Sequence, residues 1–175
     1  MFKFSFSLLL LVFIFNFSAT AQNSESKTGR KAPEFTLENI NGVNVSLKNI
    51  TGKGPVLLSF WATWCKPCIK ELTTISDVYS EWQEETGVKI YAVSVDDVRS
   101  SSLVAPMING KNWDYIVLLD QNGDFKRAMN VGPIPQTFVV NGKGEIVWQH
   151  TSFSEGAELD LINIVRKVVK GEEIK

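Results

Sequence analysis

The chain has 175 residues, of which 44% are hydrophobic and 11% aromatic, and its net charge is −1. A chain of this length and hydrophobicity can bury one full core, which predicts a single globular domain. The near-neutral charge and the lack of a basic stripe argue against nucleic acid as a partner.

The first 21 residues have the pattern of a secretory signal peptide. Lys3 precedes an unbroken apolar run over residues 8–15, and small residues surround a cleavage position between Ala21 and Gln22. We therefore expect export to an extracytoplasmic compartment, the periplasm in a bacterium. The alternative is an uncleaved anchor that holds the protein on the membrane facing the periplasm. Polar residues dilute the apolar stretch, however, and a membrane span needs about 20 mostly apolar residues.

The polar residues 22–31 are expected to form a flexible linker, and residues 32–175 to form the folded domain. Within that domain, Phe35 and Leu37 alternate with polar neighbours, and a second alternating stretch covers residues 43–47. Asn-Gly at positions 41–42 marks a turn between them. The pattern predicts an N-terminal β-hairpin.

The middle of the chain alternates between buried strands and helices. The near-continuous apolar run over residues 55–61 is typical of a strand buried on both faces. Helical spacing of apolar residues predicts one helix over 65–85, ended by Gly87, and a second buried strand follows over 88–95. Further along, the sequence predicts a helix over 98–109, a strand over 115–119, a short helix over 124–129, hairpin strands over 137–140 and 145–149, and a closing helix over 156–169.

Cys65 and Cys68 are the only two cysteines, and they stand where a predicted strand leads into a predicted helix. Residues three apart share one face of a helix, so the two sulfur atoms can form a disulfide. The positive end of the helix dipole stabilises a thiolate at Cys65, and the neighbouring Lys66 adds positive charge. Pro67 suits the first turn of a helix. We expect Cys65 to attack and Cys68 to resolve.

Three other uses of the cysteine pair are weaker explanations. A structural disulfide that closes so small a loop would add little stability. A structural zinc site needs four ligands, and the chain offers one histidine, the distant His150. Covalent haem attachment needs a histidine directly after Cys68, where the chain has Ile69. The sequence therefore predicts a redox-active pair, with no cofactor and no metal.

Two stretches, SFWATWCKPCIKE at 59–71 and VGPIPQTFVV at 131–140, resemble the thioredoxin superfamily, and within it the TlpA/ResA-like extracytoplasmic thiol-disulfide oxidoreductases. The resemblance implies an α/β fold, a thioredoxin-like three-layer sandwich with a central mixed sheet, an N-terminal β-hairpin and an inserted helix–strand unit. It also implies disulfide-containing or dithiol protein substrates and a membrane thiol-disulfide electron donor. Extracytoplasmic redox homeostasis and cytochrome c maturation are the processes it suggests.

The same resemblance assigns site residues. Pro135 matches the cis-proline that faces the cysteine pair, and Glu71 matches a glutamate that tunes the cysteines. The residues expected to contact substrate are Trp64, Lys66, Pro67 and Ile134. Apart from the resemblance, His150 is interpreted as a surface residue at the end of a strand, with no role assigned. Asp96 and Asp97 are interpreted as caps at the end of a strand, with shaping of the substrate groove as the alternative.

This sequence departs from the pattern of its relatives at two places. Ser59 stands where thioredoxins carry a buried aspartate and TlpA-like chains often carry asparagine. No proline follows Glu71 closely, so a proline kink in the helix is not indicated.

Other functions remain as alternatives. A disulfide oxidase or isomerase is one, although strong oxidants of the superfamily place a histidine between the cysteines, where this chain has Lys66 and Pro67. A peroxiredoxin-type peroxidase needs threonine or serine three residues before the reactive cysteine, where this chain has Ala62. A non-enzymatic copper carrier would need a further histidine or methionine near the pair.

Overall fold

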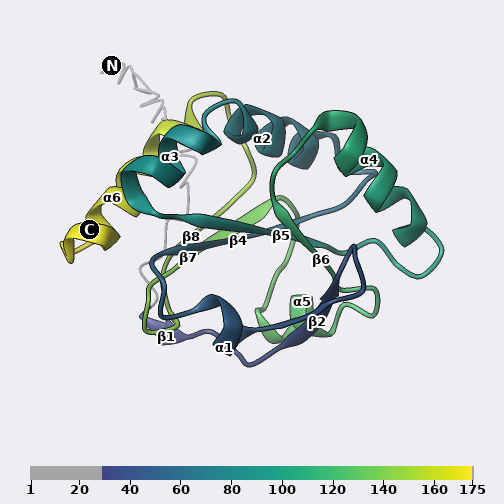
Figure 1. Cartoon of the computed structure of the whole chain (residues 1–175), viewed down its shortest axis with the longest axis horizontal. Helices are drawn as coiled ribbons and strands as arrows, with labels where there is room; N and C mark the ends of the chain where they lie inside the picture. Colours follow the sequence, from purple (N-terminus) through teal and green to yellow (C-terminus); the bar gives the residue numbers. More distant parts are fainter. Residues whose placement is uncertain (1–28, 175) are drawn as a thin grey trace, which may run out of the picture.

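The computed structural model describes residues 29–174, which form a mixed sheet with helices on both faces (Figure 1). The strands are β1 (Arg30–Lys31), β2 (Thr36–Asn39), β3 (Asn44–Ser46), β4 (Val56–Trp61), β5 (Lys89–Ser94), β6 (Ile116–Leu119), β7 (Gln136–Val140) and β8 (Glu145–Thr151). The helices are α1 (Leu47–Ile50), α2 (Lys66–Ser76), α3 (Tyr79–Thr86), α4 (Val104–Lys111), α5 (Asp124–Ala128) and α6 (Ala157–Lys170), with a 3₁₀ turn over Ser101–Leu103.

The strand order across the sheet is β1-β8-β7-β4-β5-β6-β2-β3. Strands β4, β5 and β6 are adjacent and run parallel to one another. Strand β7 pairs antiparallel with both β4 and β8. Helix α4 and strand β6 form the inserted unit, and β6 carries the β2–β3 hairpin on its outer edge. The expected fold class is therefore confirmed.

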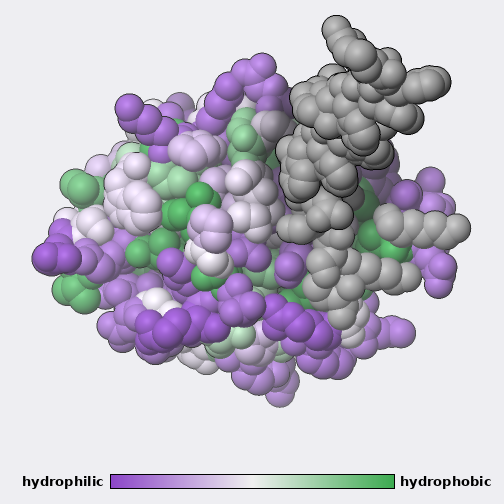
Figure 2. Space-filling model, turned by 180° about the vertical axis from the view of Figure 1, so that it is seen from behind, coloured by the Kyte–Doolittle hydropathy of each residue, from purple (hydrophilic) through white to green (hydrophobic). Residues whose placement is uncertain are grey.

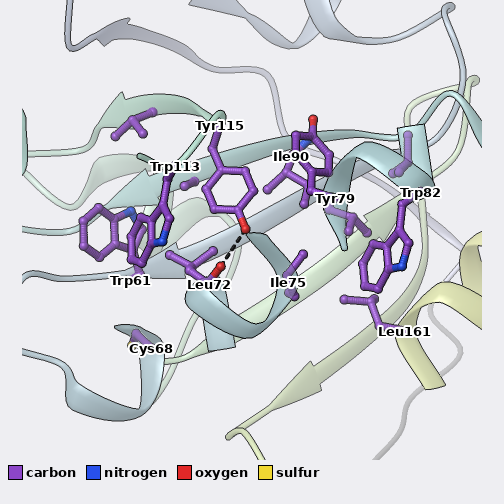
Figure 3. Close-up of a cluster of buried hydrophobic side chains, with 14 of the residues drawn as sticks. Trp61, Cys68, Leu72, Ile75, Tyr79, Trp82, Ile90, Trp113, Tyr115 and Leu161 are labelled. Carbon is purple, nitrogen blue, oxygen red and sulfur yellow. Dashed lines mark hydrogen bonds between the residues drawn. The ribbon is translucent and has the colours of Figure 1, made fainter. Parts of the chain in front are cut away.

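Helices α2, α3, α4 and α6 cover one face of the sheet, and α1 and α5 cover the other (Figure 1). Every residue of β4 and β7 is buried, because both strands lie inside the sheet between these two layers. The core under α2 is rich in aromatic side chains, including Trp61, Trp113 and Tyr115 (Figure 3). The Tyr115 hydroxyl donates a hydrogen bond of 2.6 Å to the backbone oxygen of Leu72 in α2 (Figure 3).

The prediction of one helix over residues 65–85 is wrong, because α2 and α3 are separated at Asp77 and Val78. Val78 leaves helical geometry, with φ −122° and ψ 1°, and its N–H bonds to the Ile75 oxygen in a tightened turn. The apolar spacing continues across the break, since Ile75, Tyr79 and Trp82 all face the core. Periodicity alone therefore could not reveal the interruption.

Two of the residues expected in the linker belong to the sheet. Arg30 and Lys31 form β1 and pair with Ile146 and Glu145 of β8. The Arg30 guanidinium also donates a hydrogen bond to the Met129 backbone oxygen. Residues 22–28 of the linker, the signal peptide and the cleavage position at Ala21 and Gln22 lie outside the described residues.

On the part of the described surface that is visible in Figure 2, hydrophobic residues lie among hydrophilic ones and form no broad apolar area. Within residues 29–174, no helix has the length and apolar character that crossing a membrane requires. Trp64 is among the most exposed large hydrophobic side chains, with 66% of its surface accessible.

Candidate active site

The cysteine pair lies where the buried strand β4 leads into α2. Cys65 is the N-cap of α2 rather than a residue of its first turn, and it forms a disulfide with Cys68. The Cys68 backbone N–H donates to Cys65 Sγ at 3.3 Å. This N–H and the helix dipole would also stabilise a thiolate on Cys65 after reduction. Cys65 keeps 5% of its surface accessible and Cys68 keeps none, so Cys65 is the cysteine that a substrate can reach.

The loop that leads into Cys65 is fixed by Asp96, which is 1% exposed. One Asp96 oxygen accepts from the Thr63 backbone N–H at 2.9 Å, and the other accepts from the Thr63 hydroxyl at 2.5 Å. The Ser94 hydroxyl donates to the same carboxylate at 2.8 Å. The interpretation of Asp96 as a strand-end cap is thus wrong, because parallel pairing of β4 and β5 brings it against residue 63.

Asp97, interpreted in the same way, does act as a cap. Its side chain accepts from the backbone N–H groups of Arg99 and Ser100. Its pKa lies below the ordinary value, first because of its hydrogen bond to the Arg99 guanidinium.

Pro135 lies opposite the cysteine pair, in the loop before β7. Its peptide bond with Ile134 is cis, as the resemblance implied. The Ile134 backbone oxygen is 3.9 Å from Cys65 Sγ. Within residues 29–174, the Ile134 N–H makes no hydrogen bond. A free backbone donor beside the reactive sulfur is suited to pairing with an extended polypeptide.

Glu71 is buried in α2, one turn after Cys68, with 1% of its surface exposed. Glu71 Oε1 accepts from the Thr137 hydroxyl at 3.0 Å and lies 3.1 Å from His150 Nε2. Glu71 Oε2 is buried and has no hydrogen-bond partner among the described residues. Glu71 therefore belongs to a buried polar cluster and is not a solvated helix carboxylate.

The interpretation of His150 as a surface residue is wrong. Its side chain is 13% exposed and contacts Glu71, although 79 positions separate the two residues. Ser59 of β4 pairs with Thr137 of β7, which in turn pairs with His150 of β8. Directly paired residues project on the same face of a sheet, so these polar side chains form a row beneath α2. Only the register of the three strands reveals this row, and no local sequence pattern encodes that register.

The residues expected to meet substrate are at the surface around the cysteines. Lys66 and Pro67 are exposed in the first turn of α2. Trp64 borders a groove of about 450 Å³ whose other walls include Val95, Lys126 and Val131. The structure thus brings Trp64, Lys66, Pro67, Ile134 and Pro135 together around the disulfide.

Known proteins resemble this chain in sequence. The sequence pattern of the AhpC/TSA family matches residues 28–149. Thiol-disulfide oxidoreductase ResA of Bacillus subtilis is 34% identical over 139 residues, which cover 79% of this chain and 75% of the relative. The ResA protein of Bacillus anthracis is 33% identical over 129 residues, covering 74% of this chain and 72% of the relative.

Two solved structures are also similar to this chain. A thioredoxin-like protein from Porphyromonas gingivalis is 47% identical and superposes with a TM-score of 0.70, covering 83% of this chain and 97% of that protein. A putative thiol:disulfide interchange protein DsbE from Chlorobium tepidum is 25% identical with a TM-score of 0.73, covering 81% and 97%. With its paired cysteines at the start of α2, the chain belongs to the AhpC/TSA family of the thioredoxin superfamily and is a thiol-disulfide oxidoreductase.

Proposed function

We propose that the protein is an exported reductase that opens disulfides in protein substrates with the Cys65/Cys68 dithiol. The Cys65 thiolate attacks one substrate sulfur, the substrate disulfide breaks, and a mixed disulfide forms. The Cys68 thiolate then attacks Cys65 Sγ, which releases the reduced substrate and leaves the Cys65–Cys68 disulfide. The observation that carries this order of attack is the position of Cys65 as the accessible N-cap of α2, with Cys68 fully buried behind it.

The surrounding residues support binding of an extended substrate segment. The free N–H of Ile134 can pair with the substrate backbone, and Pro135 keeps the chain close to the sulfur atoms without offering a competing N–H. Trp64 offers an exposed aromatic surface beside the cysteines. Lys66 and Pro67 form the rest of the contact surface, and Glu71 exchanges protons with Cys68.

Export is part of the same proposal. The signal-peptide pattern of residues 1–21, with cleavage between Ala21 and Gln22, supports an extracytoplasmic location such as the periplasm. A retained segment would instead anchor the protein to the membrane. In that compartment the oxidised protein would be reduced again by a membrane thiol-disulfide electron donor. Apocytochrome c is one candidate substrate, and general extracytoplasmic disulfide reduction is the broader one.

The midpoint potential of the Cys65/Cys68 pair tests the direction of electron flow. We would equilibrate the chain that begins at Gln22 in redox buffers and count free thiols by alkylation. We expect a value nearer to thioredoxin's, about −270 mV, than to that of a strong oxidant, about −120 mV. A value close to the second figure would make the protein an oxidase.

A trapping experiment tests the order of attack. Cys68→Ser should accumulate a mixed disulfide with a disulfide-containing protein such as insulin, because the resolving thiol is missing. Cys65→Ser is the matched control and should accumulate none. The reverse pattern would show that Cys68 is the attacking residue and would refute the proposed order.

A further inference from the structure

The resolving cysteine has no direct route to water for its proton. Cys68 has no accessible surface, yet its thiol must lose a proton before its sulfur can attack the mixed disulfide. Glu71 lies one turn away on the same buried face of α2. It is itself 1% exposed, so a proton that reaches Glu71 must leave through another group.

His150 is the group in contact with that carboxylate. Its Nε2 lies 3.1 Å from Glu71 Oε1, and the Thr137 hydroxyl holds the same oxygen from the other neighbouring strand. Glu71, His150 and Glu158 surround a narrow gap between α2, β8 and α6 that is too small for a water molecule. On its other side His150 borders an open pocket of about 150 Å³, together with Ser152, Ser154 and Asp160. The imidazole therefore separates the buried carboxylate from the surface.

We propose that His150 is a positioning residue that holds Glu71 beneath Cys68 and passes protons between Glu71 and solvent. The inference rests on the proposed roles of Cys68 and Glu71. It adds a path for the proton from the active-site disulfide to the pocket beside α6.

Protons and bonds balance along this path when one substrate molecule is released. The Cys68 thiol gives its proton to the Glu71 carboxylate, and the Cys68 thiolate attacks Cys65 Sγ of the mixed disulfide. The Cys65–Cys68 bond forms, the bond between Cys65 and the substrate breaks, and the substrate leaves as a thiolate. Glu71 passes its proton to His150, which releases a proton to solvent, and the substrate thiolate takes up one proton from solvent. No oxidant or reductant beyond the substrate pair is needed.

The charges around His150 are compatible with this transfer. The titratable groups that face it are Glu71 from α2 and Glu158 and Asp160 from α6. All three are acids, so the titratable groups around the imidazole do not oppose the passage of a proton. Glu158 Oε2 is buried without a hydrogen-bond partner among the described residues, as is Glu71 Oε2. From β7 and β8 the imidazole meets the neutral side chains of Thr137 and Trp148.

Single-turnover kinetics test the path, with formation and resolution of the mixed disulfide followed separately in the purified protein. His150→Gln keeps an N–H near the Nε2 position and can hold Glu71, but it cannot relay a proton. His150→Phe removes both functions. We expect resolution to slow at least about tenfold in both variants, while attack by Cys65 changes little. We also expect His150→Gln to change the pH profile of the resolution step, because a glutamine side chain neither takes up nor releases a proton.

Glu155→Gln is the matched control, because Glu155 is exposed, pairs with Lys70 and lies outside the cluster. It should resolve the mixed disulfide as the unsubstituted protein does. The inference is refuted if both His150 variants resolve the mixed disulfide at the unsubstituted rate with an unchanged pH profile. The proposed function still stands in that case, as long as the unsubstituted protein forms and resolves the mixed disulfide. If the unsubstituted protein forms no mixed disulfide, the proposed function fails first.

A spectroscopic readout does not depend on turnover. His150 is the only histidine in the chain, so its ring-proton resonance is identified without assignment experiments. We expect that resonance to move when the disulfide is reduced at a fixed pH, and to move much less in Glu71→Gln, which cannot accept the Cys68 proton. The same displacement in both proteins would mean that His150 senses the disulfide without Glu71, which contradicts the path.

Discussion

Two buried carboxylates, Asp96 and Glu71, lie close to the cysteine pair in different polar environments. Asp96 accepts hydrogen bonds from Thr63 and Ser94, which satisfy both of its oxygens. Glu71 has one oxygen paired and one without a partner among the described residues. A satisfied carboxylate fixes geometry, whereas one with a free acceptor is available for proton transfer. The two residues therefore suit structural and chemical tasks respectively.

Asp96→Asn should loosen the loop before Cys65. The amide keeps one acceptor oxygen and places an NH₂ group against the Thr63 and Ser94 donors. We expect the free energy of unfolding of the oxidised protein to fall by about 1–3 kcal/mol, the cost of unsatisfied buried donors. Urea denaturation followed by fluorescence would measure it. Asp97→Asn is the control, because Asp97 lies on the same loop with a half-exposed side chain, and the free energy of unfolding of this variant should change little. Equal effects in both variants would contradict this assignment.

At the scale of elements, α2 is held by the unit inserted between β5 and β7. Tyr115 lies directly before β6, and its hydroxyl donates to the Leu72 backbone oxygen at 2.6 Å (Figure 3). Burial raises the pKa of Tyr115 well above its ordinary value, so the hydroxyl stays protonated and remains a donor across the physiological range. The inserted unit thus extends the sheet and also anchors the helix that carries Cys68.

Tyr115→Phe should remove this anchor while keeping the aromatic packing. We expect a loss of about 1 kcal/mol in the free energy of unfolding, since a neutral hydrogen bond contributes about that much net. Tyr91→Phe is the matched control, because Tyr91 is also buried and its hydroxyl makes no hydrogen bond within residues 29–174. Urea denaturation of both variants would measure the loss in the free energy of unfolding. An equal loss in the two variants would show that the hydrogen bond to Leu72 contributes nothing.

For the whole molecule, the segment before β4 closes the hydrophobic core on the face of the sheet that α1 and α5 cover. Ala32, Phe35, Leu47 and Ile50 are buried against the face of the sheet that α5 shares. Strand β2 also covers the edge of β6. An uncovered edge strand invites pairing with another chain. The N-terminal hairpin is therefore needed for the fold. It does more than connect the sheet to the preceding residues.

A chain that begins at Lys53 should lose cooperative unfolding. Burial of a large apolar side chain contributes about 1.5–3 kcal/mol, so losing Phe35, Leu47 and Ile50 removes roughly 5–9 kcal/mol. Typical domains have only about 5–15 kcal/mol in total. Thermal unfolding and binding of a hydrophobic dye would report the loss. A chain that begins at Gly29 is the control and should unfold as the chain from Gln22 does. Cooperative unfolding of the shorter chain would refute the requirement.

Local spacing in the sequence was enough for much of this protein. Near-continuous apolar runs identified β4 and β5, and two cysteines three apart at a strand-to-helix junction identified the redox pair. The resemblance of the two motifs also predicted the cis peptide bond before Pro135 and singled out Glu71, which lies in α2 one turn after Cys68. These features lie within a few residues of one another or within a recurring motif, so they need no knowledge of how strands align.

Only the tertiary structure decided which distant side chains meet. Thr63 meets Asp96 because β4 and β5 are parallel, and Glu71 meets His150 because β7 and β8 place polar residues in one row under α2. The break between α2 and α3 leaves the apolar spacing intact, and β1 has no apolar residue to mark it. Register between strands and packing of a helix on a sheet depend on the whole core, so no local pattern encodes these contacts.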